Sequence, residues 1–237
     1  MQAEARDAVV YPTSDGRPMA ENTLQYQWIT TLKGNLDATL PDFVAGDLLW
    51  YPVEGEPSIR RAPDVLVAFG RPKGHRGSYL QWREEGIAPQ VVIEVLSPGN
   101  TAHEMNDKHL FYQTYGVQEY LVLDPENGTF QVARRSQGPG SPLLLHQSPQ
   151  AYESERLGLR FVVEQTPEGP QLRVTWLDGE PLLTFEQIHQ DRERQRLRAE
   201  AEAERAEAEA ERAEAEASRA ARLAEKLRSL GIDPDAV

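Results

Sequence analysis

Apolar residues recur every three or four positions near the beginning of the chain, over residues 21–40. This spacing is typical of a helix with one buried face, and Glu21 projects onto that same face. The apolar residues that share the spacing are Leu24, Trp28, Leu32 and Leu36. The pattern predicts a helix over residues 21–40 that packs against a core.

Three stretches rich in β-branched and aromatic residues follow, and they predict strands. Two of them, FVAGDLLWYP and APDVLVAFG, lie before a basic loop, RPKGHRGSYLQW. The third, VVIEVLSP, is nearly all apolar and is closed by Ser-Pro. We expect this third stretch to be a central strand of the sheet.

The next segment predicts a helix from about Ala102 to Tyr115, which Gly116 ends, and then a strand that stops at Asp124. A strand, a helix and a strand in close succession favour an α/β (α+β) fold with a central mixed sheet flanked by helices. Residues 129–183 predict a β-meander, with LDGEPLLT as its clearest hairpin.

The last part of the chain, residues 184–237, is almost entirely Ala, Glu and Arg. Arg205, Arg212 and Arg219 repeat every seven residues, which predicts one helix of roughly 45 residues and about 65–70 Å. One interpretation is a solvated rod held by weak Glu-Arg pairs. The other is an alanine-seamed coiled coil that joins copies of the chain or binds a partner. Neither interpretation makes this helix catalytic.

Composition narrows the classes of site that the chain can hold. Its 237 residues suffice for one domain, over 1–183, and a helical appendage over 184–237. The absence of cysteine excludes disulfides and thiolate metal sites, and the five histidines are scattered, so we expect no zinc site. The net charge of -13 disfavours a broad nucleic-acid-binding surface. Any contact with phosphate must therefore be local.

The sequence carries no signal for export or membrane insertion. The first residues, MQAEARDAVVYP, lack a basic segment followed by an apolar one, and no apolar run reaches the roughly 18 residues of a membrane helix. We therefore expect a cytoplasmic protein with no membrane partner.

Glu94 is the strongest anomaly among the predicted strands, because it lies in the middle of VVIEVL. An ionised carboxylate in an apolar strand is costly unless a metal ion or another cation compensates it. The alternative is an edge position that faces solvent. Asp64 opens the strand DVLVAF about thirty residues earlier, so adjacent strands could bring both carboxylates to one cleft. Such oxygen ligands suit Mg²⁺, or Mn²⁺ in its place, whereas the alternative for Asp64 is a turn cap.

Lys108 is the candidate for the positive group that phosphodiester hydrolysis needs near the attacking water. Such a group lowers the pKa of the water or stabilises the charge that develops on phosphate. Taken alone, Lys108 is more simply explained as a solvated lysine on the helix after Glu94.

Together these motifs resemble the Uma-two (Uma2) family of restriction-endonuclease-like proteins, which belongs to the PD-(D/E)XK nuclease superfamily. The resemblance rests on Pro63-Asp64, on VVIEVLSP, on Lys108 followed four residues later by Tyr112, and on GVQEYLVLDP. It spans roughly residues 11–184. Three further stretches, YPTSDGRPMAEN, VAGDLLWYPVEG and LRSLGIDPD, resemble a branch with a coiled C-terminal tail. The combined match is specific, although each motif alone is weak.

The resemblance implies a restriction-endonuclease-like fold and roles for particular residues. Asp64 and Glu94 would ligate the metal, and the main-chain carbonyl of Val95 would complete the shell. The superfamily places its lysine two residues after the glutamate, where this chain has Leu96. The resemblance therefore implicates Lys108 as the catalytic lysine.

Two further acidic residues enter through the same resemblance. Superfamily members often carry an acidic residue near the metal on the first helix, and Glu21 would supply it. The alternative for Glu21 is a charge favoured by the dipole at a helix N-terminus. Glu104 lies four residues before Lys108, where family members commonly carry aspartate.

The basic loop RPKGHRGSYLQWR concentrates positive charge between the two carboxylates. Arg71, Lys73 and Arg76 are the candidates for holding a phosphate backbone, and a solvated loop is the alternative. Tyr79 and Trp82 would either stack on bases or pack inside the protein.

We therefore expect a metal-dependent endonuclease that hydrolyses phosphodiester bonds in nucleic acid, with DNA as the expected substrate and a homodimer as the expected assembly. One alternative is a catalytically silent nuclease fold that binds nucleic acid or protein, which Leu96 and the net acidity make credible. The other is an assembly protein whose coiled tail is its function.

Overall fold

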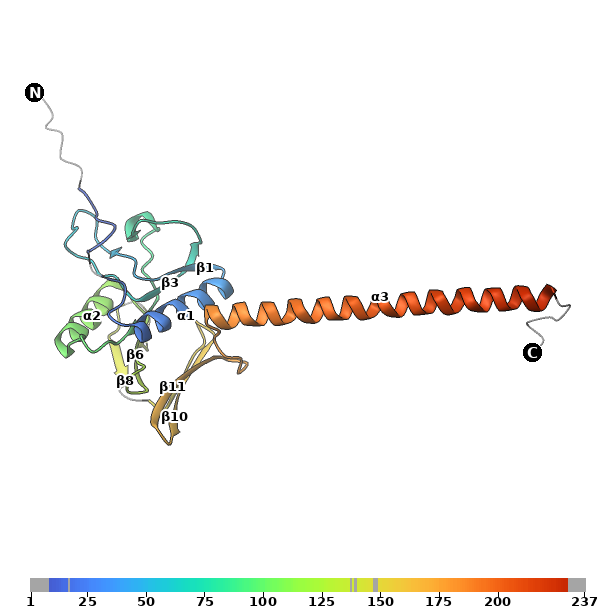
Figure 1. The fold of residues 1–237 in the computed structure, drawn as a ribbon. Coiled ribbons are helices and arrows are strands. Elements are labelled where there is room, and N and C mark those ends of the chain that lie inside the picture. The colour runs from blue at the N-terminus through green and yellow to red at the C-terminus, as the bar shows by residue number, and fades with distance from the viewer. Residues whose placement is uncertain (1–8, 17, 137, 139, 147–148, 230–237) are drawn as a thin grey trace, which may run out of the picture. The chain divides into compact units, whose positions relative to one another are not determined.

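The computed structural model describes residues 9–16, 18–136, 138, 140–146 and 149–229. The chain divides into two compact units, with the boundary between Thr184 and Phe185. The first unit holds two larger sheets and two long helices, and the second consists of helix α3 (Figure 1).

A six-stranded sheet forms the centre of the first unit, with the strand order β1-β3-β5-β6-β7-β8. Strands β5 and β6 are parallel, and every other neighbouring pair in this sheet is antiparallel. The predicted central mixed sheet with flanking helices is therefore confirmed. In sheet order, the strands are β1 (Asp42–Ala45), β3 (Val65–Pro72), β5 (Val91–Val95), β6 (Glu119–Asp124), β7 (Thr129–Arg135) and β8 (Leu143–His146).

The predicted single meander over residues 129–183 is wrong, because this segment contributes to two sheets. Strands β7 and β8 complete the six-stranded sheet, whereas the next three strands form a separate antiparallel sheet. These three are β9 (Ala151–Ser154), β10 (Leu159–Thr166) and β11 (Gly169–Trp176). At LDGEPLLT the chain does turn, but the returning residues pair with β11 only through an isolated bridge from Pro181 to Thr175.

Short elements complete the first unit. Strands β2 (Trp50–Tyr51) and β4 (Tyr79–Leu80) form a parallel pair, and the 3-10 helix η1 covers Gln81–Arg83. Tyr79 is fully buried and stacks on Phe43 at 5.9 Å between ring centroids. Of the two interpretations for Tyr79, the structure therefore supports packing in the core.

The two faces of the large sheet follow from the alternation of side chains along each strand. Val65, Ile93 and Leu121 pack in a core with residues of helix α1 (Thr23–Thr39) and of the β9–β11 sheet. Val92 and Val122 face the opposite way and pack with residues of helix α2 (Ala102–Tyr115). The large sheet is thus buried on both faces.

Helix α1 confirms the predicted helix near the N-terminus but shifts its start and its buried face. It begins after the cap Asn22, whose side chain accepts from the main-chain N–H of Gln25 at 2.8 Å. Leu24 is exposed, in contrast to the prediction. The residues that α1 buries are Gln25, Ile29, Leu32 and Leu36.

Helix α2 has the predicted bounds and the caps that explain them. The Thr101 side chain accepts from the main-chain N–H of Glu104 at 3.2 Å, and Gly116 ends the helix in the left-handed conformation with φ 106°. This conformation favours glycine. Strand β6 then ends at Asp124, as predicted.

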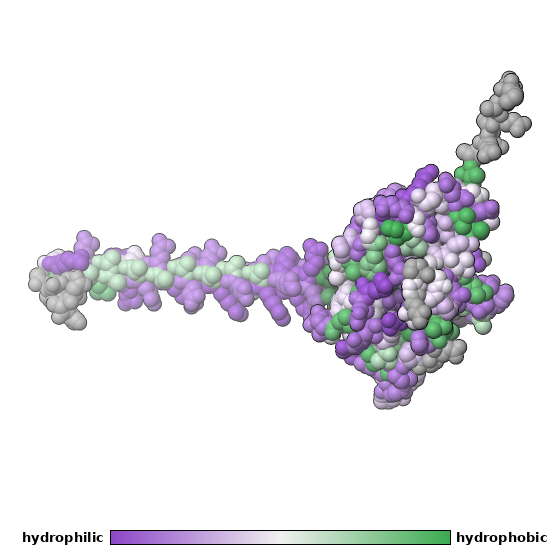
Figure 2. All heavy atoms as spheres, turned by 180° about the vertical axis from the view of Figure 1, so that it is seen from behind, coloured by the Kyte–Doolittle hydropathy of each residue, from purple (hydrophilic) through white to green (hydrophobic). Residues whose placement is uncertain are grey.

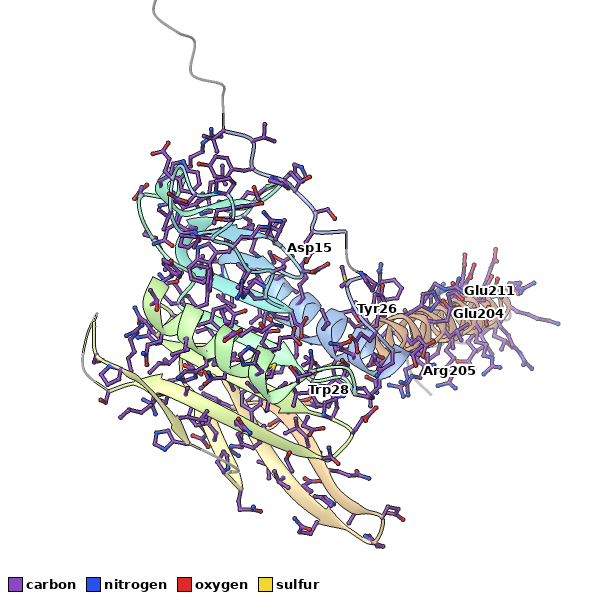
Figure 3. All side chains as sticks on the ribbon, turned by 90° about the vertical axis from the view of Figure 1, so that its left-hand side faces the viewer. Asp15, Tyr26, Trp28, Glu204, Arg205 and Glu211 are labelled. Carbon is purple, nitrogen blue, oxygen red and sulfur yellow. The ribbon has the colours of Figure 1, made fainter. Side chains whose placement is uncertain are left out.

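Helix α3 (Phe185–Ser229) has 45 residues and buries none of its side chains within the described chain. At about 1.5 Å per residue it is about 68 Å long. Figure 3 shows Glu204 and Glu211 on one side of the helix and Arg205 on another. Figure 2 shows a pale green row of weakly hydrophobic residues along it, between purple charged ones. Among the described helices, α3 included, none has the length and apolar content that a membrane span requires.

Candidate active site

Glu94 points toward α2, because it alternates with Ile93 and Val95 along β5 and shares the orientation of Val92. Its carboxylate is buried and accepts from two side chains of that helix. Lys108 Nζ lies 2.9 Å from Glu94 Oε2, and the Tyr112 hydroxyl donates to Glu94 Oε1. Lys108 and Tyr112 are four residues apart and therefore share one face of α2. The proposed edge position of Glu94 is excluded, since it is 1% exposed.

Asp64 immediately precedes β3 and meets Glu94 from the neighbouring strand. Its Oδ2 accepts from the main-chain N–H of Val95 at 2.7 Å. Burial raises the pKa of Asp64 well above its usual range, and the neighbouring Glu94 carboxylate raises it further. The Val95 N–H and the charge of Lys108 oppose these effects only in part. Two carboxylates thus lie close together where little water reaches them, and a bound cation would stabilise their charged forms.

The ammonium of Lys108 is the positive charge that faces this carboxylate pair. Burial lowers the pKa of Lys108, but the charge and hydrogen bond of Glu94, with a contribution from Asp64, outweigh burial and raise it. Lys108 therefore stays protonated at neutral pH. It can donate protons in hydrogen bonds and balance negative charge, but it cannot accept a proton in this state.

Val95 ends β5 directly after Glu94, and its main-chain N–H is the group that donates to Asp64. Its main-chain carbonyl accepts from Gln25 Nε2 at 2.8 Å, and the Gln25 side-chain carbonyl in turn accepts from the main-chain N–H of Glu21 at 2.8 Å. A carbonyl oxygen has a second lone pair for another partner. Gln25 was not predicted from the sequence, although a polar residue four positions before Ile29 on the buried helix face was a visible signal.

Glu21 lies elsewhere than predicted. It precedes the cap of α1 rather than lying on the buried face, and it is exposed. Its Oε2 accepts from Ser97 Oγ at 2.6 Å and from the Gly99 N–H at 3.2 Å. Glu21 therefore holds the loop that follows β5, and it still lines the same cleft as Asp64.

This cleft has a volume of about 950 Å³ and opens beside the carboxylate pair. Its basic lining residues are Arg60, Arg61 and Lys108. Its acidic lining residues are Asp15, Glu21, Asp47, Asp64, Glu104 and Asp107. Figure 3 labels Asp15, which lies on the N-terminal segment before α1. The cleft as a whole is acidic, with positive charge at only a few points of its wall.

Asp47, Arg60 and Arg61 are cleft residues that the sequence analysis did not identify. Asp47 adopts a left-handed conformation with φ 48°, and its N–H donates to the Pro63 carbonyl at 3.0 Å. Burial raises the pKa of Asp47, and the charges of Asp15 and Glu94 raise it further. A non-glycine residue with this backbone conformation is frequent at functional sites. The signal in the sequence was the Gly-Asp pair between two apolar stretches.

The three residues predicted to hold nucleic acid do not line this cleft. Arg71 Nε and Arg76 Nε lie 3.1 Å and 2.6 Å from the carboxylate of Glu84. Lys73 Nζ lies 3.5 Å from Asp37 Oδ1. The positive charge of this loop is thus largely balanced by local carboxylates, and a role for it in binding nucleic acid remains a prediction.

The donor atoms at the carboxylate pair match the preference of a small divalent cation. Mg²⁺ is commonly bound through one or two carboxylates and keeps several of its waters. Asp64, Glu94 and the Val95 carbonyl supply such oxygens. Within the described residues, no group of three or more His, Cys, Asp or Glu side chains is placed to hold a metal, so a dense all-protein cage is not present there. The site fits a metal that retains water.

Comparisons with known proteins identify a family and solved structures that resemble parts of the chain. No curated protein matches. The chain is similar to a solved protein described as "a putative nuclease belonging to DUF820" from Anabaena variabilis ATCC 29413. The identity is 18%, the TM-score is 0.41, and the alignment covers 60% of this chain and 76% of that one. This likeness is too weak to support an argument about function.

The family match covers most of the chain and includes the carboxylate pair and Lys108. The Uma2 family, described as "Putative restriction endonuclease", matches residues 15–174. These are more than half of the 237 residues. The chain therefore belongs to the Uma2 family of restriction-endonuclease-like proteins.

Proposed function

We propose that this chain is a metal-dependent endonuclease that hydrolyses phosphodiester bonds in DNA. The observation that carries the proposal is the convergence of Asp64 and Glu94 with Lys108 beside an open cleft. Membership of the Uma2 family supports a nuclease. Glu94 lies on β5 and Asp64 immediately precedes the adjacent strand β3, so the sheet itself fixes their spacing.

A divalent cation, Mg²⁺ or Mn²⁺, would be held by Asp64, Glu94 and the Val95 carbonyl. When bound, such an ion lowers the pKa of a coordinated water and neutralises charge on a phosphoryl oxygen. The protein prepares this place by fixing the ligands beforehand: Gln25 orients the Val95 carbonyl, and Tyr112 holds one oxygen of Glu94.

Lys108 would act in its protonated form, because the adjacent carboxylates raise its pKa. An ammonium can donate a hydrogen bond to the attacking water and orient it toward phosphorus. It can also donate to a non-bridging phosphate oxygen as negative charge develops there. Orienting the water and stabilising charge thus suit Lys108 better than accepting a proton from the water.

The test is cleavage of supercoiled and single-stranded DNA by the full chain with Mg²⁺ or Mn²⁺. We expect cleavage by the wild type, none in EDTA, and loss of at least about a hundredfold in Asp64→Asn and Glu94→Gln. Glu153→Gln, on β9 and exposed, is the matched control and should cleave normally. Cleavage that survives both site substitutions would overturn the proposal.

The second candidate is a catalytically silent nuclease fold that binds nucleic acid. Its specific support is Leu96, which occupies the superfamily position for lysine and packs in the core on the α2 side of the sheet. This candidate predicts DNA binding by a folded protein without cleavage under any metal condition. The cleavage test distinguishes it from the enzyme directly.

We also propose that α3 joins two copies of the chain as a coiled coil. Its support is a row of alanines spaced alternately by four and three residues, as in a heptad seam. The row consists of Ala199, Ala203, Ala206, Ala210, Ala213, Ala217, Ala220 and Ala224. A helix of 45 residues without buried side chains gains little stability unless such a seam is covered.

Sedimentation of full-length variants tests this assembly. We expect a dimer for the wild type and a monomer for Ala210→Glu, because a charge enters the seam. Ala208→Glu, outside the row, is the matched control and should stay dimeric. A monomeric wild type, or equal behaviour of the two variants, would contradict the proposal.

A further inference from the structure

Arg60 and Arg61 lie side by side on the wall of the cleft that contains Asp64. We propose that they form the site that binds the phosphate backbone of the nucleic acid, an inference that rests on the proposed function. Arginine matches phosphate well, because its planar guanidinium offers several N–H donors in a fixed fork. No other pair of adjacent basic residues lines the described part of this cleft.

The main chain at this pair is fixed by its pairing with β2. Trp50 N–H donates to the Arg61 carbonyl at 2.8 Å, and Arg61 N–H donates to the Trp50 carbonyl at 3.2 Å. Only two residues separate Arg61 from Asp64, so both sides of the segment are anchored. The arginines are therefore presented at a constant position relative to the carboxylates.

The side chains are also oriented without being neutralised. Arg60 Nη1 donates to the Pro57 carbonyl at 2.7 Å, and Arg61 Nη1 donates to the Arg60 carbonyl at 2.8 Å. The Arg61 guanidinium lies over the Phe111 ring at 5.2 Å. No carboxylate of the described residues forms an ion pair with either guanidinium. The Arg60 guanidinium also hydrogen-bonds the Tyr51 side chain. The other N–H donors of the two arginines are left for a ligand.

The arginines of the 71–76 loop, in contrast, are paired with carboxylates. We therefore assign the phosphate contact to Arg60 and Arg61 instead. Arg71 and Arg76 share Glu84, and the hydrogen bond from Arg76 lowers the pKa of that carboxyl although burial opposes this. Binding a phosphate there would require breaking ion pairs that are mostly shielded from solvent. Breaking these pairs costs free energy, whereas binding a phosphate at Arg60 and Arg61 breaks no ion pair among the described residues.

The acidity of the cleft makes a local basic site necessary. Six carboxylates line it, and the whole chain carries a net charge of -13. Bulk attraction therefore cannot bring a polyanion to Asp64. A backbone phosphate beside Arg60 and Arg61 would place the strand along a wall where its charge is balanced without the metal.

The experiment measures binding of a fluorescent DNA oligonucleotide to the full chain by anisotropy, in Ca²⁺ and over a range of salt. We expect Arg60→Ala and Arg61→Ala each to weaken binding about tenfold. Each should also reduce the slope of log affinity against log salt by about 0.7 to 0.9. Arg173→Ala, an exposed arginine on β11 that does not line the cleft, is the matched control and should change neither quantity.

Arg61→Lys guards against a folding artefact, because lysine keeps the charge and the stem over Phe111 but lacks the fork. It should bind between the wild type and Arg61→Ala, with the wild-type circular dichroism spectrum. Wild-type affinity in both alanine variants, equal weakening by Arg173→Ala, or no binding by the wild type would overturn the assignment.

Parallel cleavage in Mg²⁺ separates this inference from the proposed function. Cleavage by the wild type with unchanged affinity in Arg60→Ala and Arg61→Ala would overturn the arginine site alone. Binding that depends on the arginines, without cleavage by the wild type, would overturn the nuclease and leave the arginine site standing.

Discussion

Two ion pairs between a carboxylate and a basic side chain have very different surroundings in the two units of this chain. The Glu94 and Lys108 side chains are 2% and 15% exposed, whereas Arg196 and Glu193 of α3 are 59% and 46% exposed. Their N–O distances are those of ordinary or short ion pairs in both places. The environment, rather than the pairing, therefore decides what each pair does.

Burial gives the first pair its chemical consequences. Because water is largely absent, the charges of Asp64, Glu94 and Lys108 act on each other strongly. The pKa of Asp64 is raised, which disfavours its charged form, and the pKa of Lys108 is raised, which favours its charged form. On α3, water screens the pairs, so they contribute little beyond helix solubility. The chain carries many charged side chains, but only a few of them, such as Asp64 and Lys108, are shielded from water and have raised pKa values.

The largest effect is expected from removing the buried cation. Lys108→Ala leaves the Glu94 carboxylate buried without its facing ammonium, which should reduce the free energy of unfolding by about 3 kcal/mol. Cleavage should fall by about 10² to 10⁴. Urea denaturation and the DNA cleavage assay measure the two effects. Lys226→Ala on α3 is the matched control, and a Lys108→Ala protein as stable and active as this control would contradict the comparison.

Asp64→Asn should have a moderate effect on stability, and it should raise the free energy of unfolding rather than lower it. The pKa of Asp64 in the folded state is higher than its ordinary value of 3.8. The stability that protonated Asp64 contributes is therefore fully present below about pH 3.8, and it is lost as pH rises toward the pKa of the folded state. At neutral pH without metal, the neutral variant should therefore be more stable, by on the order of 1 kcal/mol. Its amide oxygen can still accept from Val95.

Urea denaturation of the wild type and Asp64→Asn across pH, in EDTA, measures this difference. The advantage of the variant should shrink as pH falls toward 3.8. An advantage that does not depend on pH, or a variant that is less stable at neutral pH, would show that Asp64 is not under electrostatic strain.

The smallest effect is expected on the exposed side of the comparison. Arg196→Ala removes ion pairs with Glu193 and Glu200, yet each exposed pair of this kind contributes only a few tenths of a kcal/mol. The free energy of unfolding, measured by thermal unfolding followed by circular dichroism, should change by less than about 0.5 kcal/mol, which is close to the noise of the measurement. A loss comparable to that of Lys108→Ala would mean that α3 is covered by a partner at this position.

The local patterns of the sequence predicted most of the fold. The helix at 102–115, its glycine stop and the strand ending at Asp124 were all foreseen, because caps and β-branched runs are local signals. The division of residues 129–183 between two sheets was not, since strand partners are chosen by tertiary packing. Local turn signals do not encode which sheet a strand joins.

At the candidate site, the sequence indicated the charged anomalies but not their partners. Glu94 was conspicuous as a carboxylate inside an apolar strand, and the structure places Lys108 against it. Gln25 and Arg61 were missed, because they come from a helix face and a loop that only the folded chain brings to the cleft. The prediction for Arg76 rested on its charge alone, because its pairing with Glu84 has no local signal in the sequence.

Binding of Mn²⁺ to the full chain, followed by electron paramagnetic resonance, examines the carboxylate pair without relying on turnover. We expect saturable binding by the wild type, loss of that binding in both Asp64→Asn and Glu94→Gln, and wild-type binding in the control Glu153→Gln. Binding of equal strength in all four proteins would contradict the claim that Asp64 and Glu94 hold the catalytic metal.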